Sequence, residues 1–284
     1  MDRKSRYHLL VMCHKADEGI RNYSPYLPIQ VGKILRPELE LGFLTDDQGD
    51  NISERNAFWS EFTGIYWAWK NIDADILGVC HYRRYFKLDV SEEHVSKLLQ
   101  KYDMIVIDGG KMLDRTSRAR NLMSMTSQED AYLFIDTVLS MHPEYYDAIY
   151  RYFYNSRFSY PYSMFIARKQ MYDEFCEFVF PLLFEVEKRV RPHGYTRLKR
   201  TVGYFGEWSL GLFILCRQLK VHAVPLEQTD AKSASFPRKV YHVIDNQIKT
   251  IAYTIANRPP KRIVVPQAIK VGLKADGIEL RALK

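Results

Sequence analysis

Short, almost continuous apolar runs recur along the first 226 residues, and polar or turn-forming residues bound each of them. Runs of about four to eight apolar residues are typical of buried strands. On this basis we predict strands at YHLLVMCHK (7–15), DILGVC (75–80), DMIVIDGG (103–110), SMFIARK (163–169) and VHAVPL (221–226).

Between these runs, apolar residues recur at the three- and four-residue spacing of one helix face. The segment 53–71 is the clearest case, with an apolar stripe of Phe58, Phe62, Ile65 and Trp69, and Asn51 or Ser53 can cap its start. We also predict helices at 89–102, 127–155 with an interruption at Pro143, 170–190 with Pro181 inside it, and 203–220, and polar loops at 20–33, 41–53 and 112–124. Alternating strands and helices predict an α/β fold with a mainly parallel sheet, which binds ligands beyond the carboxyl ends of its strands.

Beyond residue 230 the pattern changes to a basic helical extension. An apolar stripe of Val240, Ile244, Ile248, Ile251 and Ile255 lies between Arg238, Lys239 and the sequence RPPKR at 258–262. Residues 231–284 hold eleven Lys or Arg against three Asp or Glu, so they account for the formal charge of +7. We therefore divide the chain into a main domain, 1–230, and a basic extension, 231–284. The stripe either docks onto the main domain or lies on an anionic membrane surface.

Composition excludes several classes of function. No zinc-finger, helix-turn-helix or RNA-binding signature accompanies the basic charge, so a nucleic-acid partner is not expected. Cys13, Cys80, Cys176 and Cys216 lie far apart, which argues against disulfides and predicts a reducing cytoplasmic location. No signal-peptide pattern and no run of about eighteen apolar residues is present, so we expect no membrane-spanning segment.

A basic cluster follows the second predicted strand directly. In ILGVCHYRRYF (76–86), the apolar run ends at Cys80, and His81, Arg83 and Arg84 come next. If the strand is parallel, these residues lie at the ligand end of the sheet, where an Arg can bind phosphate with two hydrogen bonds. Because side chains alternate along an extended chain, only one of the two arginines can face the site. An equally weighted alternative to a ligand site is that the two arginines lie on the surface and that the histidine is a buried structural residue.

Two acidic groups are further candidates for chemistry. TDDQGDN (45–51) holds three carboxylates, which could bind a metal or sugar hydroxyls, although a solvated turn before a helix is slightly favoured. Glu207, in GYFGEWSL (203–210), could act as a base or interact with a helix N-terminus. The sequence has no GxxxxGK[ST], GxGxxG, HExxH or GxSxG motif.

Three of these segments together resemble a known family. YLPIQVGK (26–33), DDQGDNISERNAFWSEFTGIYWAWKN (46–71) and GVCHYRRYF (78–86) are similar to a bacterial family long catalogued only as a domain of unknown function. Its members occur in capsule, exopolysaccharide and O-antigen gene clusters and are regarded as glycosyltransferases. The resemblance covers roughly residues 7–226 and implies a GT-A-like, Rossmann-type α/β fold.

The resemblance to GT-A enzymes has two departures. The strand ILGVC would deliver the metal-binding Asp-x-Asp, but His81, Tyr82 and Arg83 stand there. The Glu-Asp motif that heads a late helix reads Glu207-Trp208. Arg and His could neutralise the leaving diphosphate in place of a divalent ion. The resemblance therefore does not fix a cofactor. If Mn²⁺ or Mg²⁺ is used, we expect Asp46 and Asp47 to bind it.

The resemblance implies an inverting glycosyltransferase that uses a nucleotide sugar, a UDP-sugar by expectation, and a lipid-linked oligosaccharide acceptor. It would work in the cytoplasm, or peripherally on the inner face of the membrane. Its catalytic residues would be Glu207 as base with Arg83 and His81 at the diphosphate, and its donor-binding residues His14, Gln30, Asp46, Asp47, Asn51, Glu61, Tyr82 and Arg168. The alternative is a catalytically silent binding or scaffold subunit of a polysaccharide assembly complex, which could also have lost Asp-x-Asp.

Overall fold

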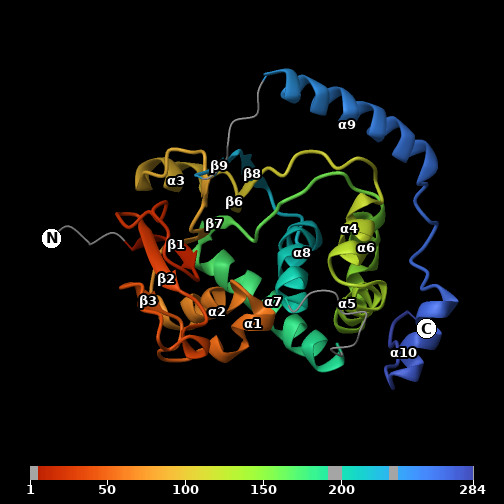
Figure 1. The fold of residues 1–284 in the computed structure, drawn as a ribbon, viewed down its shortest axis with the longest axis horizontal. Helices are drawn as coiled ribbons and strands as arrows, with labels where there is room; N and C mark the ends of the chain where they lie inside the picture. Colours follow the sequence, from red (N-terminus) through yellow and green to blue (C-terminus); the bar gives the residue numbers. More distant parts are fainter. Residues whose placement is uncertain (1–5, 191–199, 230–235, 284) are drawn as a thin grey trace. The chain divides into compact units, whose positions relative to one another are not determined.

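The computed structural model describes residues 6–190, 200–229 and 236–283, and the chain forms two compact units (Figure 1). The first unit comprises Met1–Asp108, Tyr160–Leu183 and Lys199–Asp230. The second comprises Gly109–Ser159, Phe184–Leu198 and Ala231–Lys284. Residues 231–284 share their unit with two earlier segments, and their separation as a domain of their own stays a prediction.

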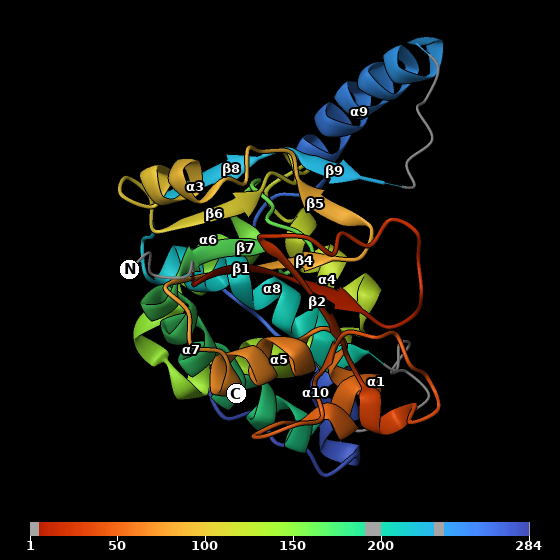
Figure 2. The ribbon, with the colours of Figure 1, turned by 90° about the vertical axis from the view of Figure 1, so that its left-hand side faces the viewer.

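A twisted sheet forms the centre of the first unit (Figure 2). Its main path has the order β3-β2-β1-β4-β7-β6-β8. The strands are β1 (Tyr7–Cys13), β2 (Tyr26–Gln30), β3 (Leu44–Thr45), β4 (Ile76–His81), β6 (Met104–Ile107), β7 (Phe165–Arg168) and β8 (Val221–Val224). β7 pairs antiparallel with both neighbours, whereas every other pair on this path is parallel. The predicted mainly parallel α/β sheet is confirmed, with β7 reversed.

Four short strands were not predicted from the sequence. β2 and β3 lie in segments with turn-forming and polar residues, which hide their apolar pattern. β5 (Arg84–Phe86) turns back from the end of β4 and pairs antiparallel with β9 (Leu226–Gln228). β5 follows the basic cluster directly after β4 and begins with Arg84, so its apolar pattern is too short to be recognised in the sequence.

The predicted helix 53–71 is broken near its middle. A 3₁₀ turn, Ser53–Arg55, leads into α1 (Asn56–Trp59), and α2 (Phe62–Asn71) follows. Ser60 separates the helices with a φ of 53°, a conformation that L-residues rarely adopt. The break changes the helical phase, so Trp59 is fully buried, whereas Phe58 of the predicted stripe is only half-buried.

Helix α8 (Thr201–Cys216) packs unusually close to α1 and α2. A Cβ on Gly203 would lie 3.0 Å from the Ser60 hydroxyl, and a Cβ on Gly206 would lie 2.3 Å from the Phe62 ring. Glycine at these two positions removes the atoms that would keep the helices apart. The close approach brings Glu207, the next residue of α8, toward Glu61 between α1 and α2.

The remaining helices of the first unit cover its sheet. α3 (Glu92–Leu98) contributes Val95 to the buried cluster that includes β1, β4 and β6. α7 (Lys169–Arg189) begins directly after β7, and its Phe180 stacks on Trp59 with ring centroids 6.2 Å apart. Large aromatic side chains thus fix the position of α1, as expected from the apolar area that they bury.

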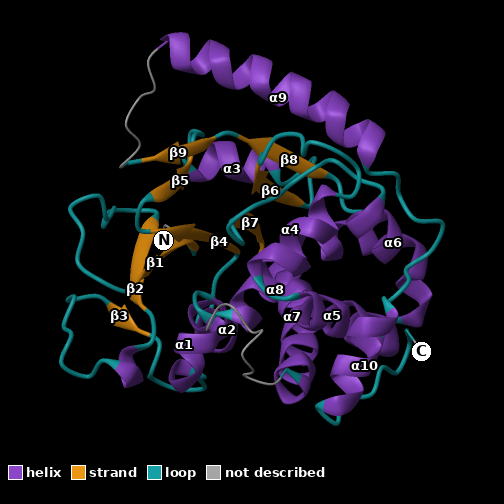
Figure 3. Cartoon of the chain, turned by 45° about the vertical axis from the view of Figure 1, so that its right-hand side comes forward, coloured by secondary structure: helices purple, strands orange, loops and turns teal. Residues whose placement is uncertain are grey.

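The second unit is helical (Figure 3). Within its described residues it contains α4 (Ser117–Met125), α5 (Gln128–Met141), α6 (Tyr146–Tyr154), α9 (Phe236–Ala256) and α10 (Gln267–Ala275). The prediction of a loop at 112–124 is wrong, because α4 occupies most of it. Asp114 stabilises the start of α4 by accepting hydrogen bonds from the backbone N–H of Thr116 and from Arg120. The predicted interruption at Pro143 is confirmed, since a 3₁₀ turn there separates α5 from α6.

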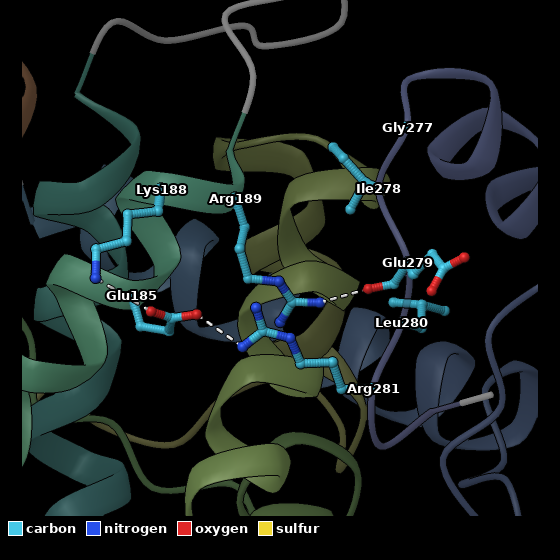
Figure 4. Close-up of a pocket in the computed structure, with 8 residues that line it drawn as sticks. All are labelled: Glu185, Lys188, Arg189, Gly277, Ile278, Glu279, Leu280 and Arg281. Carbon is cyan, nitrogen blue, oxygen red and sulfur yellow. Dashed lines mark hydrogen bonds and ion pairs between the residues drawn. The ribbon is translucent and has the colours of Figure 1, made fainter.

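A buried carboxylate holds the last described residues of the second unit. Asp136 of α5 is fully buried and accepts hydrogen bonds from the backbone N–H groups of residues 281, 282 and 283, at 2.9, 2.8 and 2.7 Å. Arg189 pairs with the same carboxylate at 2.7 Å and also donates to the Glu279 carbonyl. Nearby, Arg281 pairs with Glu185 across a cavity of about 600 Å³ (Figure 4).

We predict that Gly206→Ala lowers the free energy of unfolding by about 1–2 kcal/mol, because the new methyl group overlaps the Phe62 ring. The matched control is Gly272→Ala in α10, where the methyl group meets no atom within 4 Å. That change should raise stability by up to about 1 kcal/mol through helix propensity. Denaturation followed by circular dichroism measures both. Equal effects of the two substitutions would contradict the close approach of α8.

We predict that Asp136→Asn releases the segment 281–283, because an amide cannot match a carboxylate that accepts one guanidinium and three backbone hydrogen bonds. The loss should be about 1.5–3 kcal/mol, as for hydrogen bonds to charged groups. Hydrogen exchange of residues 281–283 should quicken by at least about tenfold. Asp147→Asn on the exposed side of α6 is the control, and similar exchange in both variants would refute the assignment.

Candidate active site

The site begins where β1 and β4 end side by side. The parallel register pairs Met12 with His81, so His14 and Tyr82 follow at the same edge of the sheet. The Tyr82 backbone N–H donates to the Met12 carbonyl at 3.3 Å, and the rings of His14 and Tyr82 meet edge to face at 5.1 Å. This is the carboxyl edge, where α/β sheets of this kind bind ligands.

The His81 imidazole is fixed in one orientation. Its Nε2 lies 2.6 Å from the Tyr162 carbonyl oxygen, which can only accept, so Nε2 carries a hydrogen. Burial lowers the pKa of His81, and the positive charge of Arg84 lowers it further, although the hydrogen bond to Tyr162 opposes both effects. At neutral pH the ring is therefore neutral, with its lone pair on Nδ1.

The turn before β7 contacts the site through two consecutive residues. Tyr162 and Ser163 have φ values of 70° and 52°, which non-glycine residues rarely adopt. The Tyr162 backbone lowers the pKa of Glu207, and the Ser163 hydroxyl donates to Glu61 at 3.3 Å. The turn therefore joins His81, Glu61 and Glu207 through its backbone and one hydroxyl.

Glu61 and Glu207 form a pair of interacting carboxylates. Burial raises the pKa of Glu61 to about 7, against weaker opposing effects of its hydrogen bonds and of Arg200 and Arg84. Burial also raises the pKa of Glu207, and the charge of Glu61 adds to that shift. By surface area the two residues are half-buried. Two neighbouring carboxyl groups that both have raised pKa values are suited to general acid–base chemistry.

The two arginines take opposite orientations from those predicted. Arg83 turns to Asp17, with Nε and one terminal nitrogen 2.8 and 2.6 Å from the same carboxylate oxygen. Arg84 lies over the Tyr162 ring at 4.4 Å and acts electrostatically on His81, Glu61 and Glu207. The reason is the immediate reversal of the chain into β5, where Arg84 pairs with His81 across the ladder. Arg84, not Arg83, thus belongs to the carboxylate cluster.

Three residues of the predicted donor pocket shape the neighbouring loops. Gln30 donates to the Leu39 carbonyl and accepts from the Leu41 backbone N–H. Asp46 is fully buried and accepts from the backbone N–H groups of residues 32 and 33 and from the Ser53 hydroxyl. Asn51 donates to the carbonyls of residues 47 and 49. These hydrogen bonds build the loops beyond β2 and β3, and a role in donor binding stays a prediction.

Asp47 and Arg168 differ from Asp46 in their surroundings. Asp47 is half-buried, and its carboxylate accepts from the Gln48 side chain at 3.2 Å. Arg168 is exposed at the end of β7, where the antiparallel register sets it beside Ile76 at the start of β4. It therefore lies at the sheet edge opposite His81, and we place Arg168 outside the site. The reversed direction of β7 explains this difference from the prediction.

The described part of the chain contains no group of three or more His, Cys, Asp or Glu side chains arranged to hold a metal ion. Asp46, one of the two predicted metal ligands, uses both carboxylate oxygens in hydrogen bonds to the protein. Any metal bound at Asp46 would have to compete with these hydrogen bonds.

Sequence reasoning missed Tyr162, Ser163 and Arg84 as members of the cluster. Positive φ values at two non-glycine residues leave no mark on the apolar pattern, and β5 was not predicted. The pair Glu61 and Glu207 lies 146 positions apart in the chain, and only the close packing of α8 brings the two together.

Comparison with known proteins gives three findings. A solved chain described as the apo structure of the WbbM bifunctional glycosyltransferase has a similar fold, with a TM-score of 0.71 and 23% identity over 81% of this chain. The match covers 46% of the WbbM chain, so this chain spans less than half of that protein. No curated protein matches the chain. The profile of one family matches residues 8–218, and the chain therefore belongs to the family described as a domain of unknown function, DUF4422.

Proposed function

We propose that the protein is a glycosyltransferase that transfers a sugar from a nucleotide-sugar donor, a UDP-sugar first, to a hydroxyl group of a glycan acceptor. The observation that carries this proposal is the carboxylate pair Glu61 and Glu207, placed beside His81 and Arg84 at the carboxyl edge of the sheet. The fold shared with a WbbM glycosyltransferase chain supports it.

The proposed reaction is a single displacement with inversion. The acceptor oxygen attacks the anomeric carbon and forms the new glycosidic bond while the bond to the diphosphate oxygen breaks. Glu207 takes the proton of the acceptor hydroxyl as that bond forms. Burial, and after it the charge of Glu61, raises the pKa of Glu207, which makes the ionised carboxylate a stronger base.

The leaving nucleoside diphosphate gains negative charge as the bond breaks, and cationic groups must stabilise it. Arg84 is the first candidate because its guanidinium lies in the carboxylate cluster. His81 lies at the same edge, but its Nε2–H is donated to Tyr162, so it could donate to the diphosphate only after Nδ1 takes up a proton. Arg83 remains a candidate if a bound diphosphate displaces Asp17 from it. A divalent ion such as Mn²⁺ or Mg²⁺, if it entered with the donor, could stabilise the negative charge of the diphosphate in the same way.

The acceptor that we propose is a lipid-linked oligosaccharide in capsule, exopolysaccharide or O-antigen synthesis, on the cytoplasmic face of the membrane. This part rests on the family resemblance of the three sequence segments. A catalytically silent scaffold is the competing proposal. The shifted pKa values of Glu61 and Glu207 favour the enzyme, because a purely structural protein gains nothing from two repelling, partly buried carboxylates.

We predict that Glu207→Gln lowers turnover by about 10²- to 10⁴-fold, because the amide cannot accept the acceptor proton. Nucleotide release from a panel of nucleotide sugars, with and without manganese, measures it. Glu177→Gln, on the exposed side of α7, is the control and should retain full turnover. Unchanged transfer by a well-folded Glu207→Gln protein would remove Glu207 as the base. Absence of donor binding and release by the unmodified protein would favour the scaffold.

We predict that Glu61→Gln shifts the acidic limb of the pH–rate profile to lower pH. The base must be ionised, and the charge of Glu61 contributes to the raised pKa of Glu207. Removing that charge lowers the pKa of Glu207, so activity persists at more acidic pH while the maximal rate falls. A limb that stays in place or moves to higher pH would show that the two carboxylates do not interact.

We predict that Glu61→Gln stabilises the fold increasingly as pH rises from about 4.5 to about 7, the unfolded and folded pKa values of this carboxyl group. Below that range the neutral acid and the amide are nearly equivalent, whereas above it only the wild type must ionise a buried group. The gain at pH 8 should be about 1–3 kcal/mol. Thermal unfolding at pH 5 and pH 8 measures it. A constant difference between the two proteins at both pH values would contradict the raised pKa.

A further inference from the structure

The described part of α9 presents an apolar face to solvent. Ile248, Ile251 and Ile255 recur at the three- and four-residue spacing of one helix face, and their exposed fractions are 63%, 63% and 71%. Val240 and Ile244 continue this stripe in the sequence, but their side chains lie outside the described residues. Isolated exposed apolar residues are common on proteins, whereas a stripe of isoleucines along one helix is not.

The opposite face of α9 contacts α4, another helix of the second unit. The guanidinium of Arg120 in α4 lies over the Tyr253 ring, 5.4 Å from its centroid. Tyr253 is two residues from both Ile251 and Ile255, and residues two apart on a helix point in widely different directions. Lys249 forms an ion pair with Asp245 on the polar side of α9. The apolar face is therefore on the side of α9 opposite to its contact with α4.

The charge around this face is strongly positive. Residues 236–262 hold six Lys or Arg and one acidic residue, Asp245. Arg258, Lys261 and Arg262 follow the helix directly and are exposed. Among the helices that the structure describes, α9 included, none is long and apolar enough to span a membrane. The combination is a helix with an apolar stripe, a polar face and flanking cations.

We propose that α9 binds an anionic lipid surface, lying along it with Ile248, Ile251 and Ile255 in the boundary between headgroups and acyl chains. A basic amphipathic helix binds such surfaces through its buried apolar area together with attraction to anionic headgroups. A second copy of the chain is a poor occupant, because it would bring the same six cations against these six. The proposal goes beyond glycosyl transfer and does not depend on it.

The test is cosedimentation of the full chain with vesicles of phosphatidylcholine alone and of phosphatidylcholine mixed with phosphatidylglycerol. Binding should require phosphatidylglycerol and should weaken as the salt concentration rises. The double substitution Ile251→Asn with Ile255→Asn should lower the affinity by at least about tenfold, since it removes most of the described apolar stripe. Because both side chains are exposed, the fold should tolerate the change, and circular dichroism checks this.

Two further variants separate the contribution of the cations after α9 from that of its apolar stripe. Replacing Arg258, Lys261 and Arg262 together by Gln should weaken binding to the anionic vesicles and reduce its salt dependence. Val271→Asn in α10 removes a similarly exposed apolar side chain, 58% exposed, outside the proposed surface and should leave binding unchanged.

The proposal fails if the unmodified chain does not bind phosphatidylglycerol vesicles, or if the isoleucine variant binds as well as the wild type. It also fails if the wild type forms a dimer in solution that the same isoleucine substitutions abolish, since a second copy would then cover the face. Because vesicle binding is measured without any sugar donor, loss of glycosyl transfer alone leaves this result unaffected.

Discussion

The close packing of α8 against α1 and α2 is the contact on which the candidate site depends. Gly203 and Gly206 remove the side chains that would separate α8 from Ser60 and Phe62. With larger residues there, Glu207 and Glu61 would move apart, and the charge of Glu61 would affect Glu207 less. The close packing at the two glycines therefore determines how strongly Glu61 acts on Glu207. It thereby affects the pKa of the proposed catalytic base.

The reversed strand β7 has a comparable effect on the other side of the site. The chain enters β7 through Tyr162 and Ser163, both with positive φ, and these residues contact His81, Glu207 and Glu61. Strain of this kind persists only where the surroundings determine the conformation. Burial of the cluster favours the neutral forms of His81 and Glu61, since it lowers the pKa of the imidazole and raises that of the carboxyl group.

The apolar pattern predicted the parts of the fold that bury long continuous surfaces. β1, β4, β6, β7 and β8, and α5, α7 and α8, follow from it, because burial dominates their sequences. The pattern failed where local hydrogen bonds decide the structure. Asp114 stabilises the start of α4 in a polar segment, and Ser60 interrupts a helix whose apolar spacing runs through the break.

For the candidate site, Glu207 and His81 were predicted and lie in one cluster, whereas Arg83 and Arg168 do not join them. The direction of β7 and the turn into β5 decided those positions, and neither is encoded in hydrophobic periodicity. Glu61 entered only through the family resemblance, and its interaction with Glu207 required the tertiary structure. Sequence reasoning therefore found the residue types of the site better than it found their geometry.

Carboxyl ¹³C NMR titration of the glutamate-labelled protein is the most direct test of the central claim, that Glu61 and Glu207 form an interacting pair. The account predicts that the Glu61 resonance titrates near pH 7, and that Glu61→Gln moves the titration of the Glu207 resonance to lower pH by removing the neighbouring negative charge. If Glu61 instead titrates near 4.5, or if the titration of Glu207 is unchanged in the Glu61→Gln protein, the paired-carboxylate account is wrong.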